Sequence, residues 1–308
     1  MILVSGGTGF VGSHLVPRLV KGEKGEDKIK CLVRNSAKAR AEALREEGVE
    51  LAPGDVTRLQ SLREAMLGVD TVIHLVAIIR ESKAATFYGV NAQGTGNMVE
   101  AALESGVKRF IHISALGASP DPRYRYTYSK WQGEEAVRNS KLDYTIFRPS
   151  VIFGQGVGYS FVDSMIRSLT MFPLIAPLPG GGKTRFQPIW VEDVVSCIIQ
   201  ALRDRGEGKI GESKKIYEIG GPEHLTYQDM LDAVIHVLGT RRVRVHIPIP
   251  LMRLVALAME RAMSNPPVTS VELAQLDLDN ITDLGSVERH FGFKPVAISQ
   301  KLSYIRPS

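Results

Sequence analysis

Short, almost wholly apolar segments alternate with helical patterns through the first half of the chain. Apolar runs without a polar alternation are typical of strands that are buried on both faces of a parallel sheet. The regular alternation of strand and helix therefore predicts an α/β fold, a Rossmann-type doubly wound parallel sheet with right-handed crossovers. The predicted strands are Ile2–Ser5, Ile29–Val33, Val49–Ala52, Thr71–Leu75, Arg109–Ser114 and Thr145–Phe147, and the predicted helices are Val11–Lys21, Ala37–Glu47, Leu59–Leu67, Thr86–Ser105 and Tyr126–Asn139.

The pattern changes after Pro149, where glycine and proline cluster and helices predominate. We expect a first domain over residues 1–150, whose sheet is completed by residues of about 185–220, and a smaller, mostly helical lobe over 151–308 that is interleaved with it. One strand, Lys215–Ile219, should return to the sheet. The helices predicted in this half are Phe161–Leu169, Glu192–Arg203, Tyr227–Leu238, Pro250–Ala262 and Leu284–His290, and the predicted surface loops are Ala118–Arg125 and Asp204–Lys214.

A glycine turn separates the first strand from the first helix, with glycines at positions 6, 9 and 12. In a dinucleotide-binding turn the first glycine permits the tight bend, the second allows backbone to approach the pyrophosphate, and the third allows close helix–strand packing. The helix start offers N–H groups and a positive dipole end to the phosphates. We therefore expect the first domain to bind a dinucleotide through Gly6, Thr8, Gly9, Phe10, Val11 and Gly12.

The end of the second strand indicates which dinucleotide is bound. An acidic residue there would bind the ribose hydroxyls and favour NAD, but this chain has Arg34 there, with Lys38 and Arg40 nearby. A guanidinium can bind a 2′-phosphate with two hydrogen bonds, so NADP(H) is the preferred cofactor and NAD(H) the alternative. After the third strand, Asp55 and Val56 are candidates for an adenine contact. The structural alternative for Asp55 is a helix N-cap.

These residues resemble the short-chain dehydrogenase/reductase superfamily, in its extended or atypical members, and the likeness extends through most of the chain. Within it, the chain is similar to an atypical branch that includes the accessory subunit of respiratory complex I with this fold and its bacterial relatives. The resemblance implies that Leu75 and Ala77 lie under the cofactor and Pro149 beside the nicotinamide. It is carried by Gly6–Gly12, Gly54–Val56, His74–Ala77, Val90–Thr95, Ser114–Gly117, Tyr126 with Lys130, Asp143–Ser150, Ile152–Gly154, Trp190–Val194, Gly220–Pro222 and Gln275–Asn280.

The resemblance also implies a catalytic group made of Ser114, Tyr126, Lys130 and Asn91. Tyr126 and Lys130 are four apart on a predicted helix, so their side chains share a face. A neighbouring ammonium lowers the pKa of a tyrosine, which could then pass a proton while NADPH passes a hydride. Lys130 would also hold the nicotinamide ribose, Ser114 would bind the substrate oxygen, and Asn91 would brace the site through backbone or water contacts.

Three functions remain open on these residues. The first is an NADP(H)-dependent oxidoreductase that acts on a carbonyl, quinone-like or sugar-nucleotide substrate. The second is a non-catalytic, NADPH-holding accessory or assembly protein of an NADH:quinone oxidoreductase, peripherally associated with that membrane complex. The third is a nucleotide-sugar epimerase or dehydratase with bound NAD, against which Arg34 argues.

Composition and charge limit the binding partners and the cellular compartment that we expect for the protein. The net charge of +5 is scattered, without the concentrated basic patch or interleaved aromatics that nucleic-acid binding needs. Cys31 and Cys197 have no metal or redox spacing and are expected to be buried, reduced thiols, consistent with a cytoplasmic protein. The histidines show no metal-ligand spacing, and His74 and His112 are expected to be core residues with satisfied hydrogen bonds. We expect a soluble monomer or homodimer without a signal peptide.

Two apolar stretches of the second half carry further hypotheses. Ile247–Met263 includes Arg253, Glu260 and Arg261 and is interpreted as a buried or amphipathic helix rather than a membrane span, with a membrane-peripheral role as an alternative. Leu169–Pro179 is either an apolar flap over a hydrophobic substrate or a packed core segment. Arg185 and Gln187 are polar candidates for lining the same cleft.

Overall fold

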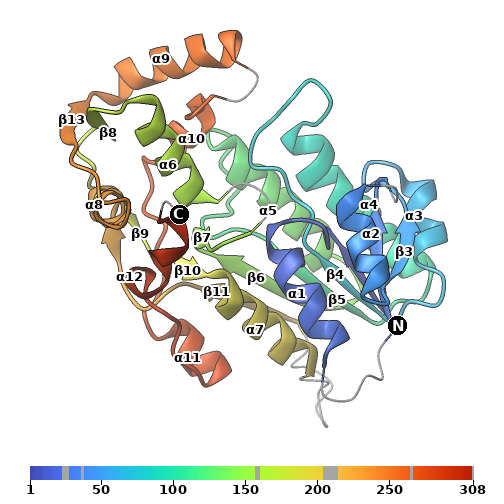
Figure 1. Ribbon diagram of the computed structural model, residues 1–308. Helices are drawn as coiled ribbons and strands as arrows, with labels where there is room; N and C mark the ends of the chain where they lie inside the picture. The colour runs from blue at the N-terminus through green and yellow to red at the C-terminus, as the bar shows by residue number, and fades with distance from the viewer. Residues whose placement is uncertain (23–27, 36–37, 157–159, 204–213, 264–265, 307–308) are drawn as a thin grey trace. The chain divides into compact units, whose positions relative to one another are not determined.

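The computed structural model describes residues 1–22, 28–35, 38–156, 160–203, 214–263 and 266–306 (Figure 1). The chain divides into two compact units. Unit 1 is Met1–Arg148 with Gly156–Gly158 and Val194–Tyr217, and unit 2 is Pro149–Gln155, Tyr159–Asp193 and Glu218–Ser308. Of the predicted loop Asp204–Lys214, all but Lys214 lies outside the described residues, as does Ala37 at the start of a predicted helix.

A seven-stranded sheet forms the centre of the fold, in the order β11-β6-β5-β4-β1-β2-β3. Neighbouring strands from β3 to β6 run parallel, which confirms the predicted doubly wound α/β class. Successive strands move outward from β1 on one side and from β4 on the other, so the ligand-binding switch point of this topology lies at the β1–β4 junction. The strands are β1 (Ile2–Ser5), β2 (Ile29–Val33), β3 (Glu50–Pro53), β4 (Thr71–His74), β5 (Arg109–Ile113), β6 (Asp143–Pro149) and β11 (Lys215–Ile219).

Helices flank this sheet, with α3, α4 and α5 packed in sequence against one another. Helix α1 lies beside α7, where Arg18 donates to the Ser196 hydroxyl at 3.0 Å. The predicted helix Thr86–Ser105 is not uniform, because its first turn is a π-helical turn, η1, that continues into α4. The helices of this part are α1 (Phe10–Val20), α2 (Ala39–Glu46), α3 (Leu59–Ala65), η1 (Tyr88–Gln93), α4 (Gly94–Glu104), α5 (Arg125–Arg138) and α7 (Val191–Arg203), which begins in unit 2.

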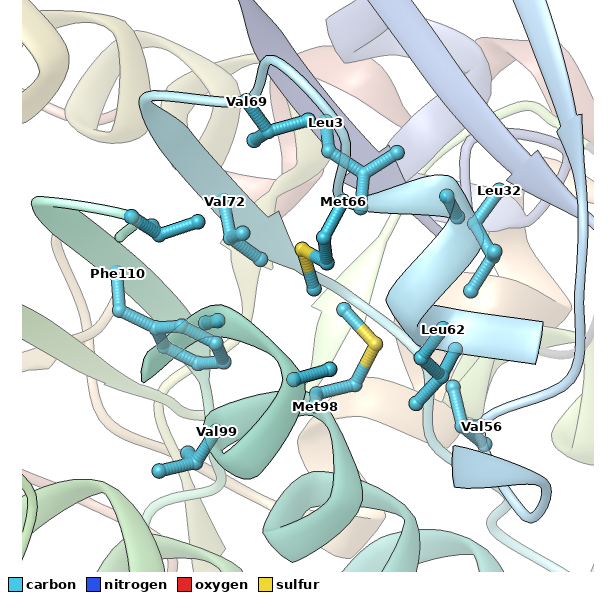
Figure 2. Close-up of a cluster of buried hydrophobic side chains, with 14 of the residues drawn as sticks. Leu3, Leu32, Val56, Leu62, Met66, Val69, Val72, Met98, Val99 and Phe110 are labelled. Atoms are coloured by element: carbon cyan, nitrogen blue, oxygen red, sulfur yellow. The ribbon is translucent and has the colours of Figure 1, made fainter. Parts of the chain in front are cut away.

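The core of unit 1 lies between the sheet and the helices α3 and α4. Figure 2 shows Met66 and Met98 between Val72 of β4 and Leu62 of α3, with Phe110 of β5 beside them. These side chains are fully buried, and burial of each is worth about 1.5–3 kcal/mol. The apolar strands therefore have the environment that their sequence predicts.

Unit 2 has its own core and three two-stranded pairs: β10 with β7, β12 with β9, and β13 with β8. Its predicted helices are confirmed, but its short strands were not predicted. The strands are β7 (Ile152–Phe153), β8 (Ile175–Pro179), β9 (Arg185–Phe186), β10 (Ile189–Trp190), β12 (Leu225–Thr226) and β13 (Val243–Ile247). The remaining helices are α6 (Phe161–Met171), α8 (Tyr227–Val237), α9 (Ile249–Ala262), α10 (Ser270–Gln275), α11 (Ser286–Phe291), α12 (Ile298–Lys301) and the 3₁₀ turn η2 (Leu302–Ile305).

The segment Leu169–Pro179 is packed rather than a free flap. Leu169 ends the buried side of α6, and β8 pairs with β13 in parallel. Ala176 and Leu178 are fully buried in the core of unit 2. The packed alternative is therefore correct for the part of this segment in β8.

Candidate functional site

The glycine turn joins β1 to α1 and leaves the start of that helix without a side-chain cap. Gly6 has a left-handed φ of +79°, and its carbonyl oxygen accepts a hydrogen bond from the Gly9 N–H at 2.9 Å. A Cβ on Gly12 would overlap that same carbonyl oxygen. Gly9 is the N-cap and has no side chain, so the N–H groups of Phe10 and Val11 lack a capping acceptor. This turn has the close backbone and free donors that a dinucleotide pyrophosphate requires.

Three cations gather where β2 ends and α2 begins. Arg34 directly follows β2, Lys38 is the N-cap of α2, and Arg40 lies in its first turn; all three are exposed. None of them forms an ion pair with a residue in the described ranges. A cation at a helix N-terminus is disfavoured by the helix dipole. An anionic group bound here would relieve that repulsion.

Asp55 and Val56 follow β3 but differ in their surroundings. The Asp55 carboxylate accepts hydrogen bonds from the Thr57 backbone N–H at 2.9 Å and from its hydroxyl at 2.8 Å. The N-cap of α3 is Arg58, so the N-cap alternative for Asp55 is wrong and its side chain instead closes the preceding turn. Val56 is buried in the core, and its carbonyl accepts from the Asn97 amide at 2.8 Å.

A buried hydrogen-bonded chain begins at the switch point. Ser5, the last residue of β1, lies opposite His74 of β4, and the Ser5 hydroxyl is 2.7 Å from the His74 Nδ1. The His74 Nε2 is 3.0 Å from the Thr95 hydroxyl, which donates to the Asn91 carbonyl oxygen at 2.8 Å. Since Thr95 has given its one proton to Asn91, it accepts from His74. The His74 proton is therefore on Nε2, and Nδ1 accepts from Ser5.

The Asn91 side chain continues this chain to the helix that carries Tyr126. Its amide donates to the Ile78 carbonyl at 3.0 Å and to the Ser129 hydroxyl at 3.1 Å, and its oxygen accepts from the Ile78 N–H at 2.8 Å. Ser129 in turn donates to the Tyr126 carbonyl at 2.7 Å. Asn91 thus links the loop after β4 to α5 through its side chain, whereas backbone or water contacts were expected.

Lys130 and Ser114 meet at the end of β5. The Lys130 ammonium is buried and donates to the Ile113 carbonyl oxygen at 2.8 Å. The next residue is Ser114, whose buried hydroxyl has no hydrogen-bond partner among the described residues. A buried hydroxyl without a partner is costly, and a bound ligand oxygen could satisfy it.

Burial sets the protonation of the two titratable groups on α5. It raises the pKa of the half-buried Tyr126 to about 12, so the expected lowering of this pKa by the neighbouring Lys130 ammonium is not found. Burial also lowers the pKa of Lys130 to about 8, although the nearby Glu134 carboxylate partly opposes this. At neutral pH, Tyr126 therefore keeps its proton and most Lys130 side chains remain charged.

The two strand histidines differ, and the prediction for one of them is wrong. The His74 and His112 rings stack with centroids 5.3 Å apart, and burial is the main cause that lowers the pKa of His74 to about 3 and that of His112 well below its ordinary value. His74 is satisfied at both nitrogens. Neither ring nitrogen of His112 makes a hydrogen bond of normal geometry with a described residue.

Within unit 1, the structure brings Ser114, Lys130 and Asn91 together with the backbone of Tyr126. The Tyr126 ring packs edge-to-face on the Phe87 ring, with the ring centroids 5.8 Å apart. Sequence reasoning missed Ser5, Thr95 and Ser129. The other predicted cofactor residues lie on separate loops: the half-buried Thr8 in the glycine turn, Leu75 against Gly6, the exposed Ala77 two residues on, and Pro149 at the end of β6, where unit 2 begins.

Arg185 and Gln187 are engaged within unit 2. Arg185 forms an ion pair with Asp279 at 2.7 Å. The buried Gln187 donates to the Gly221 carbonyl at 2.8 Å and accepts from the Thr282 N–H at 2.7 Å. Both side chains connect segments of unit 2, which is the structural role and not the predicted cleft lining. Cys31 and Cys197 are buried and are not joined by a disulfide, as expected, and burial raises the pKa of Cys31 to about 12.

The chain is similar to several characterised proteins along most of its length. It is 28% identical over 287 residues to the mitochondrial protein named NADH dehydrogenase (ubiquinone) 1 alpha subcomplex subunit 9 of Arabidopsis thaliana, covering 91% of this chain and 68% of that protein. It is 30% identical to an NAD(P)H azoreductase of Xenophilus azovorans, covering 78% of this chain and 74% of that one. The crystal structure of an NADPH-dependent quinone oxidoreductase of Escherichia coli, complexed with NADPH, has the same fold with a TM-score of 0.76 at 18% identity, covering 99% of both chains.

A family model matches the part of the chain that contains the candidate site. The model of the NAD dependent epimerase/dehydratase family matches residues 2–220, which include the glycine turn, the buried chain from Ser5 to Ser129 and the Tyr126–Lys130 pair. The predicted resemblance is thereby confirmed, including its likeness to a complex I subunit. This chain belongs to the NAD dependent epimerase/dehydratase family.

Proposed function

We propose that the protein is an NADP(H)-dependent oxidoreductase that reduces a carbonyl, quinone-like or sugar-nucleotide substrate. When bound, NADPH supplies the hydride. The observation that carries the proposal is the pairing at the end of β5, where the unpartnered Ser114 hydroxyl directly follows the carbonyl that receives the Lys130 ammonium at 2.8 Å. One helical turn before Lys130 stands Tyr126, which retains its proton at neutral pH.

Each of these three groups has a separate task. The Ser114 hydroxyl donates to the substrate oxygen and orients the carbonyl. Tyr126 delivers its proton to that oxygen as the hydride reaches the carbon, and its phenolate then regains a proton from solvent. The Lys130 ammonium stabilises the phenolate and binds the nicotinamide ribose. Asn91 is a positioning residue, since its side chain holds Ser129 and thereby the backbone at Tyr126.

The preference for NADP(H) is supported by charge. Arg34 and Lys38 lie at the end of β2 and the N-cap of α2, without an ion-pair partner among the described residues. A 2′-phosphate there would bind two cations and the helix start at once. The azoreductase relative is named for NAD(P)H and the quinone oxidoreductase neighbour was crystallised with NADPH, which agrees with this choice.

The test is consumption of NADPH and NADH over a panel of quinones, ketones and nucleotide sugars, with wild type, Tyr126→Phe and Tyr128→Phe in parallel. Loss of the proton donor should lower kcat by about 10²–10⁴-fold without changing the NADPH Kd. Tyr128 lies two residues after Tyr126 on α5 and stacks on Trp131. Tyr128→Phe is therefore the matched control and should keep wild-type turnover. Equal turnover in wild type and Tyr126→Phe would refute this role of Tyr126.

A second function is favoured by the likeness to a subunit of a respiratory NADH dehydrogenase. The protein would then hold NADPH as an accessory or assembly factor, peripherally associated with such a complex and without turnover. Tight NADPH binding together with no consumption on the whole panel distinguishes this function from the first. Turnover that depends on Tyr126 excludes it as the sole function.

A further inference from the structure

Helix α9, drawn in orange in Figure 1, exposes apolar side chains on the side opposite the one that packs on α10. Met252 and Ala256 form its buried side and pack with Leu273 of α10. The opposite side exposes large apolar residues, of which Leu251 is 52% and Leu254 65% exposed. A helix that is apolar all round normally lies in a core or in lipid. The exposed residues of this outer face are Leu251, Leu254, Val255, Leu257, Ala258, Arg261 and Ala262.

Two of the three charged side chains of α9 are bound by neighbouring residues. Arg253 donates to the Asp277 carboxylate at 2.9 Å, and Glu260 accepts from the N–H and hydroxyl of Ser270, at the start of α10, at 2.6 and 3.0 Å. Within α9, all of which the structure describes, Arg261 is the single charged side chain on the outer face. The outer face therefore suits an apolar partner.

The stretch of chain that contains α9 is rich in arginine. Residues 241–261 hold five arginines against one glutamate, of which Arg244 pairs with Asp232 at 2.8 Å and Arg253 with Asp277 at 2.9 Å. Arg241 before β13 and Arg261 at the end of α9 are exposed and make no ion pair with a residue in the described ranges. A second exposed apolar pair, Leu174 and Val243, is joined at 3.1 Å by a backbone hydrogen bond two residues from Arg241.

We propose that the outer face of α9 docks on an anionic phospholipid surface. The apolar side chains enter the acyl boundary, while the flanking arginines bind lipid phosphates, each contributing about 1 kcal/mol near such a surface. In the part of the chain that the structure describes, no helix is both long and apolar enough to cross a membrane. The 14 residues of α9 span about 21 Å, which suits a helix lying in the plane of the interface.

The test is flotation of the purified full-length chain with vesicles of phosphatidylcholine alone or mixed with phosphatidylglycerol. We expect binding to the mixed vesicles that weakens in high salt, and at least a tenfold fall in the partition coefficient for Leu254→Glu. Leu67→Glu, at an equally exposed leucine of unit 1, is the control and should bind like wild type. Arg261→Glu should weaken binding to the mixed vesicles only.

Thermal unfolding and NADPH affinity of each variant report whether it is folded, independently of lipid. No flotation of the folded wild type, or equal flotation of Leu254→Glu, overturns the proposal. A concentration-dependent dimer that Leu254→Glu dissociates, seen by ultracentrifugation without vesicle binding, overturns it in favour of a second copy of this chain.

Discussion

Several helices of the two units begin in different ways, although α9, α11 and α12 of unit 2 also lack a side-chain cap. In unit 2, α6, α8 and α10 each start with a capping box, in which Ser160, Thr226 or Thr269 exchanges hydrogen bonds with an acidic residue three positions on. In unit 1, α1, α2, α3 and α5 start without any side-chain cap, after N-cap residues Gly9, Lys38, Arg58 and Tyr124. Unit 2 satisfies these helix starts internally, whereas unit 1 leaves them to solvent or a ligand.

This difference separates stability from ligand binding. A capping box stabilises a helix by about 1 kcal/mol and leaves its first N–H groups occupied. An uncapped start at the switch point loses that stability and keeps N–H donors for an anion. Changes at the open helix starts of unit 1 should therefore alter cofactor affinity, while changes at the capped starts of unit 2 should alter stability alone.

The largest effect is expected from Gly12→Ala. The new Cβ would overlap the Gly6 carbonyl oxygen and force the turn open, so the NADPH Kd should rise at least about 100-fold, or 2.7 kcal/mol. Isothermal titration measures it. Gly96→Ala is the control, because a Cβ there meets nothing within 4 Å, and its Kd should match wild type. Unchanged affinity in Gly12→Ala would break the proposed link between the turn and the cofactor.

The next largest effect is a loss of folding stability in acid, caused by the buried His74 at the end of β4. The unfolded chain binds a proton at His74 near pH 6.5, whereas burial lowers the folded-state pKa to about 3, so stability falls as pH drops below 6.5. Between pH 6.5 and 5 the loss should be about 2 kcal/mol from this residue. Urea unfolding at both pH values measures it, with the buried His112 acting in the same direction. If His74→Gln keeps the same acid-dependent loss, the stability change does not come from His74.

The smallest effect is expected at a capped start in unit 2. Thr226→Ala removes the hydroxyl that accepts from the Asp229 N–H at 3.1 Å and should cost about 1 kcal/mol of unfolding free energy. Thr226→Ser retains the hydroxyl and should restore stability. The NADPH Kd should be the same in all three proteins, and a weaker Kd in Thr226→Ala would contradict the division between the two units.

The sequence predicts the sheet better than it predicts the site. Ile2–Ser5 and Ile29–Val33 have the predicted bounds, since strands buried on both faces leave a largely apolar run. The edge strand Lys215–Ile219 also has the predicted bounds, although it is only partly buried. Strand β8 was missed because it contains Pro177 and Pro179, which usually argue against a strand.

The buried chain through His74 could not be predicted, because its links depend on tertiary contacts. His74 meets Ser5 across 69 positions and Thr95 across 21, and no local pattern reports either contact. The π-helical turn around Asn91 has the same origin, as Asn91 is held by Ile78 and Ser129. By contrast, Gly6 and Gly12 were predictable, because the bend and the close packing leave no room for other residues.

The central claim is that the glycine turn and the uncapped start of α1 bind a nicotinamide dinucleotide, with Arg34 selecting the 2′-phosphate. Titration of NADPH and of NADH into wild type and Arg34→Ala tests it most directly, with Arg45→Ala at the other end of α2 as the control. The account predicts saturable binding with NADPH tighter than NADH, and about a tenfold loss for NADPH alone in Arg34→Ala. Failure of the wild type to bind either nucleotide would contradict it.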